Sequence, residues 1–83
     1  MKHAGFAALD AIEPLLVEIR AIPGLVERSR GVFYRNSRAF LHFHEDLSGM
    51  HADIRPAAEF ERYRVETAGE REGLLRLIRE LAG

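Results

Sequence analysis

Residues 31–55 alternate between apolar and polar side chains, whereas the segments on either side repeat their apolar residues every three or four positions. A period of two places successive side chains on opposite faces of a β-strand, and a period near 3.6 places them along one face of a helix. The chain is therefore predicted to form a sheet in its middle, with a helix before it and a helix after it.

The run "GVFYRNSRAFLHF" predicts two strands that meet at Asn36-Ser37, because asparagine tolerates a positive φ. A two-residue loop implies the cross-strand pairs Tyr34 with Ala39, Val32 with Leu41 and, on the other side of the sheet, Phe33 with Phe40. A second turn within "EDLSGM" leads into the strand "MHADIR", and the charged segment "FERYRV" is predicted to be an edge strand. The sheet is thus expected to have four antiparallel strands.

Both helices are predicted from their apolar spacing. In "LDAIEPLLVEIRAIPG" the helix is expected to begin at Asp10 or Glu13, because Pro14 is tolerated only in the first turn, and to end at Pro23-Gly24. The second helix is predicted over residues 67–82, where Thr67 and Glu70 form a capping box.

The order α-β-β-β-β-α over 83 residues predicts a single α+β domain, residues 1–83, folded as a two-layer sandwich. We expect the N- and C-terminal helices to cover the same face of the sheet. The opposite face would then be free of helices and would carry Phe33, Phe40, His42, His44, His51, Asp53 and Arg55.

This helix-free face is the predicted functional surface. Two phenylalanines surrounded by histidine and arginine are typical of an interface with an apolar centre and a polar rim. We therefore expect a small binding or protein-interaction module that forms a homodimer or binds an unidentified protein or small molecule.

The histidines allow a second interpretation. Two registers fit the short turn: His44 opposite His51 with His42 opposite Asp53, or His44 opposite Asp53 with His42 opposite Arg55. In both, side chains suited to zinc, iron or nickel come together, so the alternative function is metal binding by His42, His44, His51 and Asp53. The favoured interpretation is a hydrogen-bonded polar face, with no cofactor and no metal needed for folding.

Other functions are expected to be absent. The chain has no nucleophile elbow and no glycine-rich phosphate loop, so an enzyme is not the favoured prediction. Arginines cluster between residues 28 and 38, and a weak nucleic-acid site there is a further alternative. Because the net charge is −1, nucleic-acid binding is not expected.

The sequence contains no cysteine, no apolar stretch long enough to span a bilayer and no export signal. These features favour a cytoplasmic protein that does not act at a membrane.

The run "IRAIPGLVERSRGVFYRNSRAFLHFHED", followed by "ADIR" and a leucine-rich helix, resembles a group of short bacterial proteins of unknown function. Through "AIPGLVE" and the order of its elements, the chain is also similar to the MmcQ/YjbR type of small α/β protein. Members of that type are often described as DNA-binding, and the resemblance transfers no functional residue to this chain.

Overall fold

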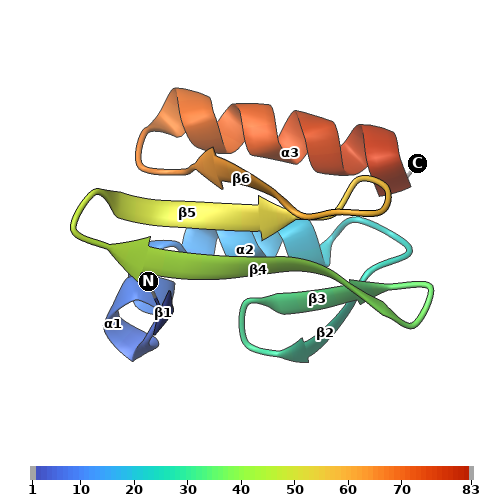
Figure 1. Ribbon diagram of the computed structural model, residues 1–83, viewed down its shortest axis with the longest axis horizontal. Helices are drawn as coiled ribbons and strands as arrows, with labels where there is room; N and C mark the ends of the chain where they lie inside the picture. Colours follow the sequence, from blue (N-terminus) through green and yellow to red (C-terminus); the bar gives the residue numbers. More distant parts are fainter. Residues whose placement is uncertain (1, 83) are drawn as a thin grey trace.

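The computed structural model describes residues 2–82 and confirms an α+β fold with an antiparallel sheet and helices toward both ends of the chain (Figure 1). The helices are α1 (Phe6–Ala11), α2 (Glu13–Arg20) and α3 (Ala68–Ala82). The strands are β1 (Lys2–His3), β2 (Val26–Ser29), β3 (Val32–Arg35), β4 (Arg38–Asp46), β5 (Gly49–Ile54) and β6 (Glu61–Arg64).

The main sheet has five strands in the order β2-β3-β4-β5-β6, and the two-residue β1 pairs with β4. The prediction of four strands is therefore wrong. The strand it lacks is β2, whose sequence VERS contains a single apolar residue and has no buried position. An edge strand of this kind has no alternating apolar stripe, which is the signal that identified the other strands.

The N-terminal helical region is two helices rather than one. α1 ends at Ala11 and α2 begins at Glu13, which places Pro14 in the first turn of α2. Proline has no N–H to donate to a preceding carbonyl, so a continuous helix through residue 14 would lose a hydrogen bond and meet a steric clash. The expected start at Asp10 or Glu13 holds for α2, whereas α1 was not expected.

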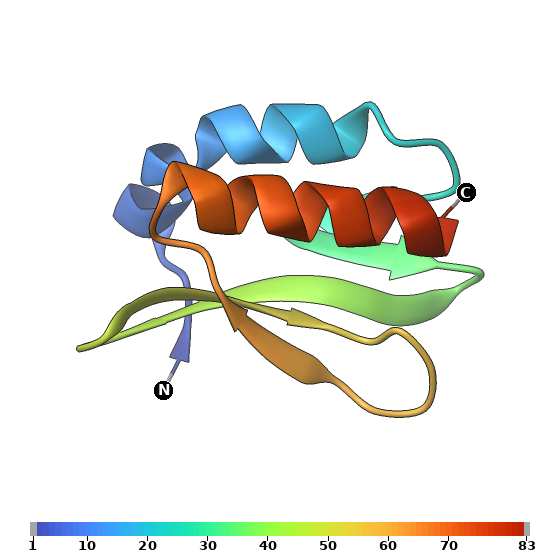
Figure 2. The same ribbon diagram turned by 90° about the horizontal axis from the view of Figure 1, so that it is seen from above.

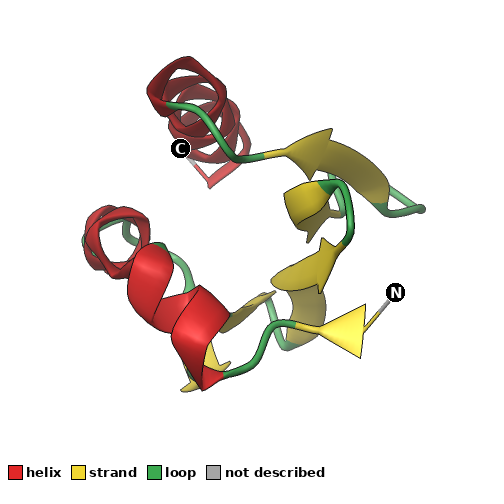
Figure 3. Cartoon of the chain, turned by 90° about the vertical axis from the view of Figure 1, so that its left-hand side faces the viewer, coloured by secondary structure: helices red, strands yellow, loops and turns green. Residues whose placement is uncertain are grey.

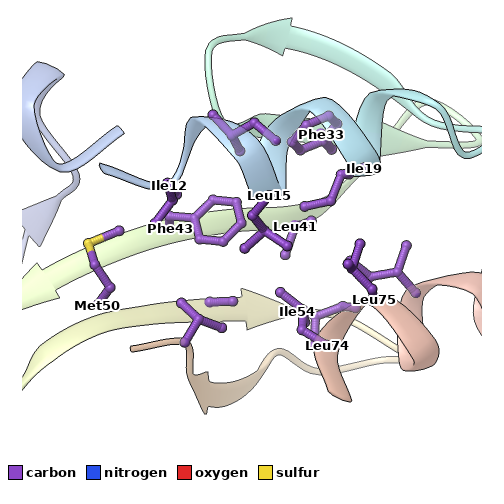
Figure 4. Packing of buried hydrophobic residues seen from close by; sticks show 14 of the residues in the cluster. Ile12, Leu15, Ile19, Phe33, Leu41, Phe43, Met50, Ile54, Leu74 and Leu75 are labelled. Carbon is purple, nitrogen blue, oxygen red and sulfur yellow. The ribbon is translucent and has the colours of Figure 1, made fainter. Parts of the chain in front are cut away.

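Helices α2 and α3 lie side by side on the same face of the sheet (Figures 2 and 3). Their apolar side chains point toward those of β4 and β5 and form one core, shown by Ile19, Leu41, Phe43, Ile54 and Leu74 (Figure 4). Leu41 and Ile54 are completely buried. The opposite face of β4 and β5 carries no helix, as the sequence predicts.

The predicted pairing of β3 with β4 is partly wrong. Tyr34 does pair with Ala39, but Phe33 pairs with Leu41, so that Phe40 is an extra residue in β4 and the register shifts there. A shift by one residue moves a side chain to the other face of a strand. Phe33 is consequently a core residue, 1% exposed.

Phe40 is also buried, at 3% exposure. The expectation that Phe33 and Phe40 form an uncovered apolar patch is therefore wrong. The expectation of a homodimer rested on that patch, so the structure gives no support for it.

Two local predictions are confirmed. Asn36 and Ser37 have φ values of 53° and 66°, as a tight two-residue hairpin turn requires. At the start of α3, the Glu70 N–H donates to Thr67 Oγ1 at 3.1 Å and the Thr67 N–H donates to Glu70 Oε1 at 3.0 Å. Within residues 2–82, no helix has the length and apolar character that crossing a membrane would require.

Candidate functional site

The central part of the helix-free face is built by β4 and β5. His42 lies opposite Asp53 and His44 lies opposite His51, which is the first of the two registers allowed by the sequence. The face on which these side chains lie follows from burial: Leu41, Phe43, Ala52 and Ile54 are all buried on the helix side, so their neighbours along each strand must point the other way.

Three of these polar side chains meet at one point. His44 Nε2 lies 2.8 Å from His42 Nδ1 and 3.1 Å from Asp53 Oδ2. One potential ligand atom from each residue lies within 4.8 Å of the other two. We call His42, His44 and Asp53 the polar triad.

Two of the three side chains of the triad are largely buried. The side chains of His44 and Asp53 are 13% and 11% exposed. The ring of Phe60 lies 4.9 Å from the ring of His42, between centroids.

The two imidazole nitrogens of the triad are 2.8 Å apart, so they cannot both direct lone pairs at each other, and a proton must lie between them. A metal cation could replace that proton.

Arg62 of β6 holds the carboxylate of the triad. Its Nε donates to Asp53 Oδ1 at 2.7 Å and its Nη2 donates to Asp53 Oδ2 at 2.8 Å, a bidentate ion pair. The Arg62 guanidinium lowers the pKa of Asp53 below its ordinary value of 3.8, although burial acts in the opposite direction. Asp53 is therefore an ionised, oriented carboxylate at neutral pH.

His51 does not join the triad, although the sequence placed it among the candidate ligands. Its Nε2 is 3.4 Å from Ser48 Oγ, and its Nδ1 is 3.9 Å from Asp46 Oδ1. The imidazole is thus directed toward the β4–β5 turn. Three of the four predicted metal ligands are gathered in one place.

Arg55, the last predicted residue of this face, lies beyond the triad, at the end of β5. Its backbone N–H donates to the carbonyl of Phe40 at 2.9 Å. Its guanidinium carbon is 5.2 Å from the centroid of the Phe60 ring. Arg55 is therefore a neighbour of the triad and not a member of it.

The basic segment between residues 28 and 38 does not form one continuous cationic surface. Arg30 makes ion pairs with Asp10 and Glu13, both at 2.7 Å. Arg28 stacks on Tyr34, with its guanidinium carbon 4.3 Å from the ring centroid. Only Arg35 and Arg38 remain near each other, as cross-strand partners at the β3–β4 turn.

Two residues of the site, Phe60 and Arg62, were not predicted from the sequence. Both belong to "FERYRV", whose alternation is too irregular to show which side chains share a face with Asp53. The register of β6 supplies the answer, because Arg62 lies directly opposite Asp53. From sequence alone, a single arginine in an edge strand is interpreted as a solvent-exposed charge, because its cross-strand partner is not known.

Comparison of the chain with protein-family models, curated proteins and solved structures finds no match.

Proposed function

We propose that the protein is a small binding module that holds one divalent transition-metal ion on its helix-free face, through His42, His44 and Asp53. The observation that carries the proposal is the convergence of two imidazole nitrogens and a carboxylate oxygen, 2.8 Å and 3.1 Å apart at the two closest approaches. Around a tetrahedral zinc ion with bonds of 2.0–2.1 Å, ligand atoms are separated by about 3.3 Å. The two closest approaches in the triad are slightly shorter than that spacing, and all three ligand atoms lie within 4.8 Å of one another.

The ion pair between Arg62 and Asp53 is compatible with this function. Carboxylates that bind metals are commonly oriented by a second hydrogen-bonding partner, and Arg62 provides one. The same contact keeps Asp53 ionised, which a ligand must be. A bound ion would take Asp53 Oδ2, the oxygen nearest His44, in place of the hydrogen bond from Arg62 Nη2, while Arg62 Nε keeps its contact with Oδ1.

The donor set indicates the kind of ion. Two imidazoles and one carboxylate suit zinc, iron or nickel, and they do not suit calcium or magnesium, which prefer oxygen ligands. Structural zinc sites usually have four protein ligands, whereas three leave a position for water or another ligand. We therefore expect the ion to be accessible and exchangeable.

Isothermal titration calorimetry with zinc and with nickel at pH 7.5 tests the proposal. Wild type should bind one equivalent per chain, and His44→Gln should bind at least about tenfold more weakly, because a direct ligand is lost. His51→Gln is the matched control, since His51 shares the strand pair but lies outside the triad, and it should bind as wild type does.

The affinity should also fall at pH 5.5, where protonation of the imidazoles competes with the metal. Equal heats for wild type and His44→Gln, or a loss caused by His51→Gln alone, would contradict the proposal.

A further inference from the structure

A pocket lies where the β3–β4 turn meets the C-terminal end of β5. Figure 1 shows both segments at the same end of the sheet. The pocket has a volume of about 120 Å³. It is lined by Arg35, Asn36, Arg38, Ala39, Phe40, Arg55, Pro56 and Ala57.

Three of the lining residues are arginines, and none is acidic. Across residues 2–82, no carboxylate lies within 4.0 Å of Arg35, Arg38 or Arg55, whereas other arginines, such as Arg20 and Arg62, are ion-paired. The positive charge of this pocket is therefore not neutralised by the described part of the chain.

Two of the arginines face each other directly. Arg35 and Arg38 are the last cross-strand pair before the tight turn at Asn36 and Ser37. Like charges directly opposite in an antiparallel pair are destabilising. An anion bound between them would remove that repulsion and form charge-assisted hydrogen bonds with both side chains.

Aromatic rings orient two of the guanidinium groups. The guanidinium carbon of Arg35 is 5.8 Å from the centroid of Phe40, and that of Arg55 is 5.2 Å from the centroid of Phe60. Stacking of this kind restricts a long side chain before it meets a ligand. The pocket thus combines restrained donors with a short, rigid turn.

We infer that Arg35, Arg38 and Arg55 bind the phosphate group of a small phosphate ester. The paired N–H donors of a guanidinium group match the spacing of phosphate oxygens. The three positive charges of the pocket are balanced more completely by a phosphate dianion than by a monoanion such as a carboxylate. The pocket volume corresponds to about four water molecules at roughly 30 Å³ each, which is room for one tetrahedral oxyanion. The inference is independent of the proposed metal site.

Chemical-shift titration of the arginine Nε–H and backbone amide resonances tests this inference. The probes are inorganic phosphate, methyl phosphate, acetate and a single-stranded oligonucleotide, at constant ionic strength, with protein stripped of metal and then freed of chelator. Both phosphates should shift the Arg35, Arg38 and Arg55 resonances. Arg38→Gln or Arg55→Gln should weaken binding about tenfold, the effect of one lost charge-assisted hydrogen bond.

Arg28→Gln is the matched control, because Arg28 belongs to the same basic segment and stacks on Tyr34 outside the pocket. It should bind methyl phosphate as wild type does. Binding should also persist in His44→Gln, so that failure of the metal proposal and failure of this one are distinguishable.

Three results would overturn the assignment: equal affinity in wild type, Arg38→Gln and Arg55→Gln; acetate bound as tightly as phosphate; or an oligonucleotide bound more tightly than methyl phosphate.

Discussion

At the scale of single residues, Asp53 connects the candidate site to the stability of the fold. It is 8% exposed, charged, and contacted by both Arg62 and His44. A buried carboxylate is tolerated only when its oxygens have partners. Asp53 is therefore a ligand in the proposed metal site. In the metal-free protein it is the acidic partner in an ion pair that joins β5 to β6.

The depressed pKa of Asp53 predicts how stability depends on pH. Arg62 holds this pKa below 3.8 in the folded protein. A carboxyl group of this kind contributes stability at every pH above its unfolded value and loses the contribution as the pH falls through its folded value. The stability difference between wild type and Asp53→Asn should therefore be constant near neutral pH and shrink below about pH 4.

Urea denaturation of both proteins from pH 7 to pH 2.5 measures this difference. In the Arg62→Gln background the loss should be smaller and should be complete at higher pH, because the group that lowers the folded pKa of Asp53 is gone. Parallel stability curves for wild type and Asp53→Asn down to pH 3 would show that the ion pair has no energetic role.

The individual site residues differ in how far the sequence could predict them. His42, His44 and Asp53 follow from parity alone, because the apolar residues that alternate with them must be buried. Arg62 and Phe60 do not, since their strand lacks a regular alternation. His51 was placed on the correct face, but its contacts with Ser48 and Asp46 depend on side-chain rotamers, and a sequence pattern contains no information about these.

At the scale of elements, one extra residue in β4 changes the face of the sheet on which the aromatic side chain of Phe33 lies. The register shift at Phe40 turns Phe33 into the core, beneath the helices. Regular alternation through both strands was a reasonable expectation, but a bulge leaves no signature in the apolar pattern of a short hairpin. Strand β2 and the break between α1 and α2 were not predicted for the same reason. Both are features of local geometry that leave no periodic pattern of apolar residues.

Replacing Phe33 tests this correction. Because Phe33 is 1% exposed, Phe33→Ala should reduce the free energy of unfolding by about 3–5 kcal/mol. Phe6, which is 82% exposed, is the matched control, and Phe6→Ala should leave the unfolding free energy nearly unchanged. Denaturant unfolding monitored by circular dichroism measures both. A small effect of Phe33→Ala, equal to that of Phe6→Ala, would restore the exposed position predicted from the sequence.

At the scale of the whole molecule, the two faces of the sheet differ in composition. The face covered by α2 and α3 contains the apolar core, including completely buried residues from both helices and from β4 and β5. The helix-free face carries the polar triad. The arginine pocket lies at the end of the sheet, where the β3–β4 turn meets the segment after β5. This division follows from the order of periodicities along the chain, which is why it could be predicted before the register was known.

A fold stabilised in this way should not depend on the ion. Metal-stripped protein should retain its helical and strand signals and unfold cooperatively, and zinc at 100 times its dissociation constant should raise the unfolding free energy by about 2.7 kcal/mol. The measurement is urea denaturation with and without zinc, with His44→Gln as the control that should gain little. Loss of structure on removal of metal would instead identify a structural zinc site.

The most direct test of the metal site is nitrogen NMR of the imidazole rings during addition of one equivalent of zinc at pH 7.5. His44 Nε2 lies 2.8 Å from His42 Nδ1 and 3.1 Å from Asp53 Oδ2, so the resonances of these two ring nitrogens should shift together and saturate at one ion per chain. The nitrogens of His51, which face Ser48 and Asp46, should not move. Unchanged His42 and His44 resonances, or shifts confined to His51, would contradict a metal site at the triad.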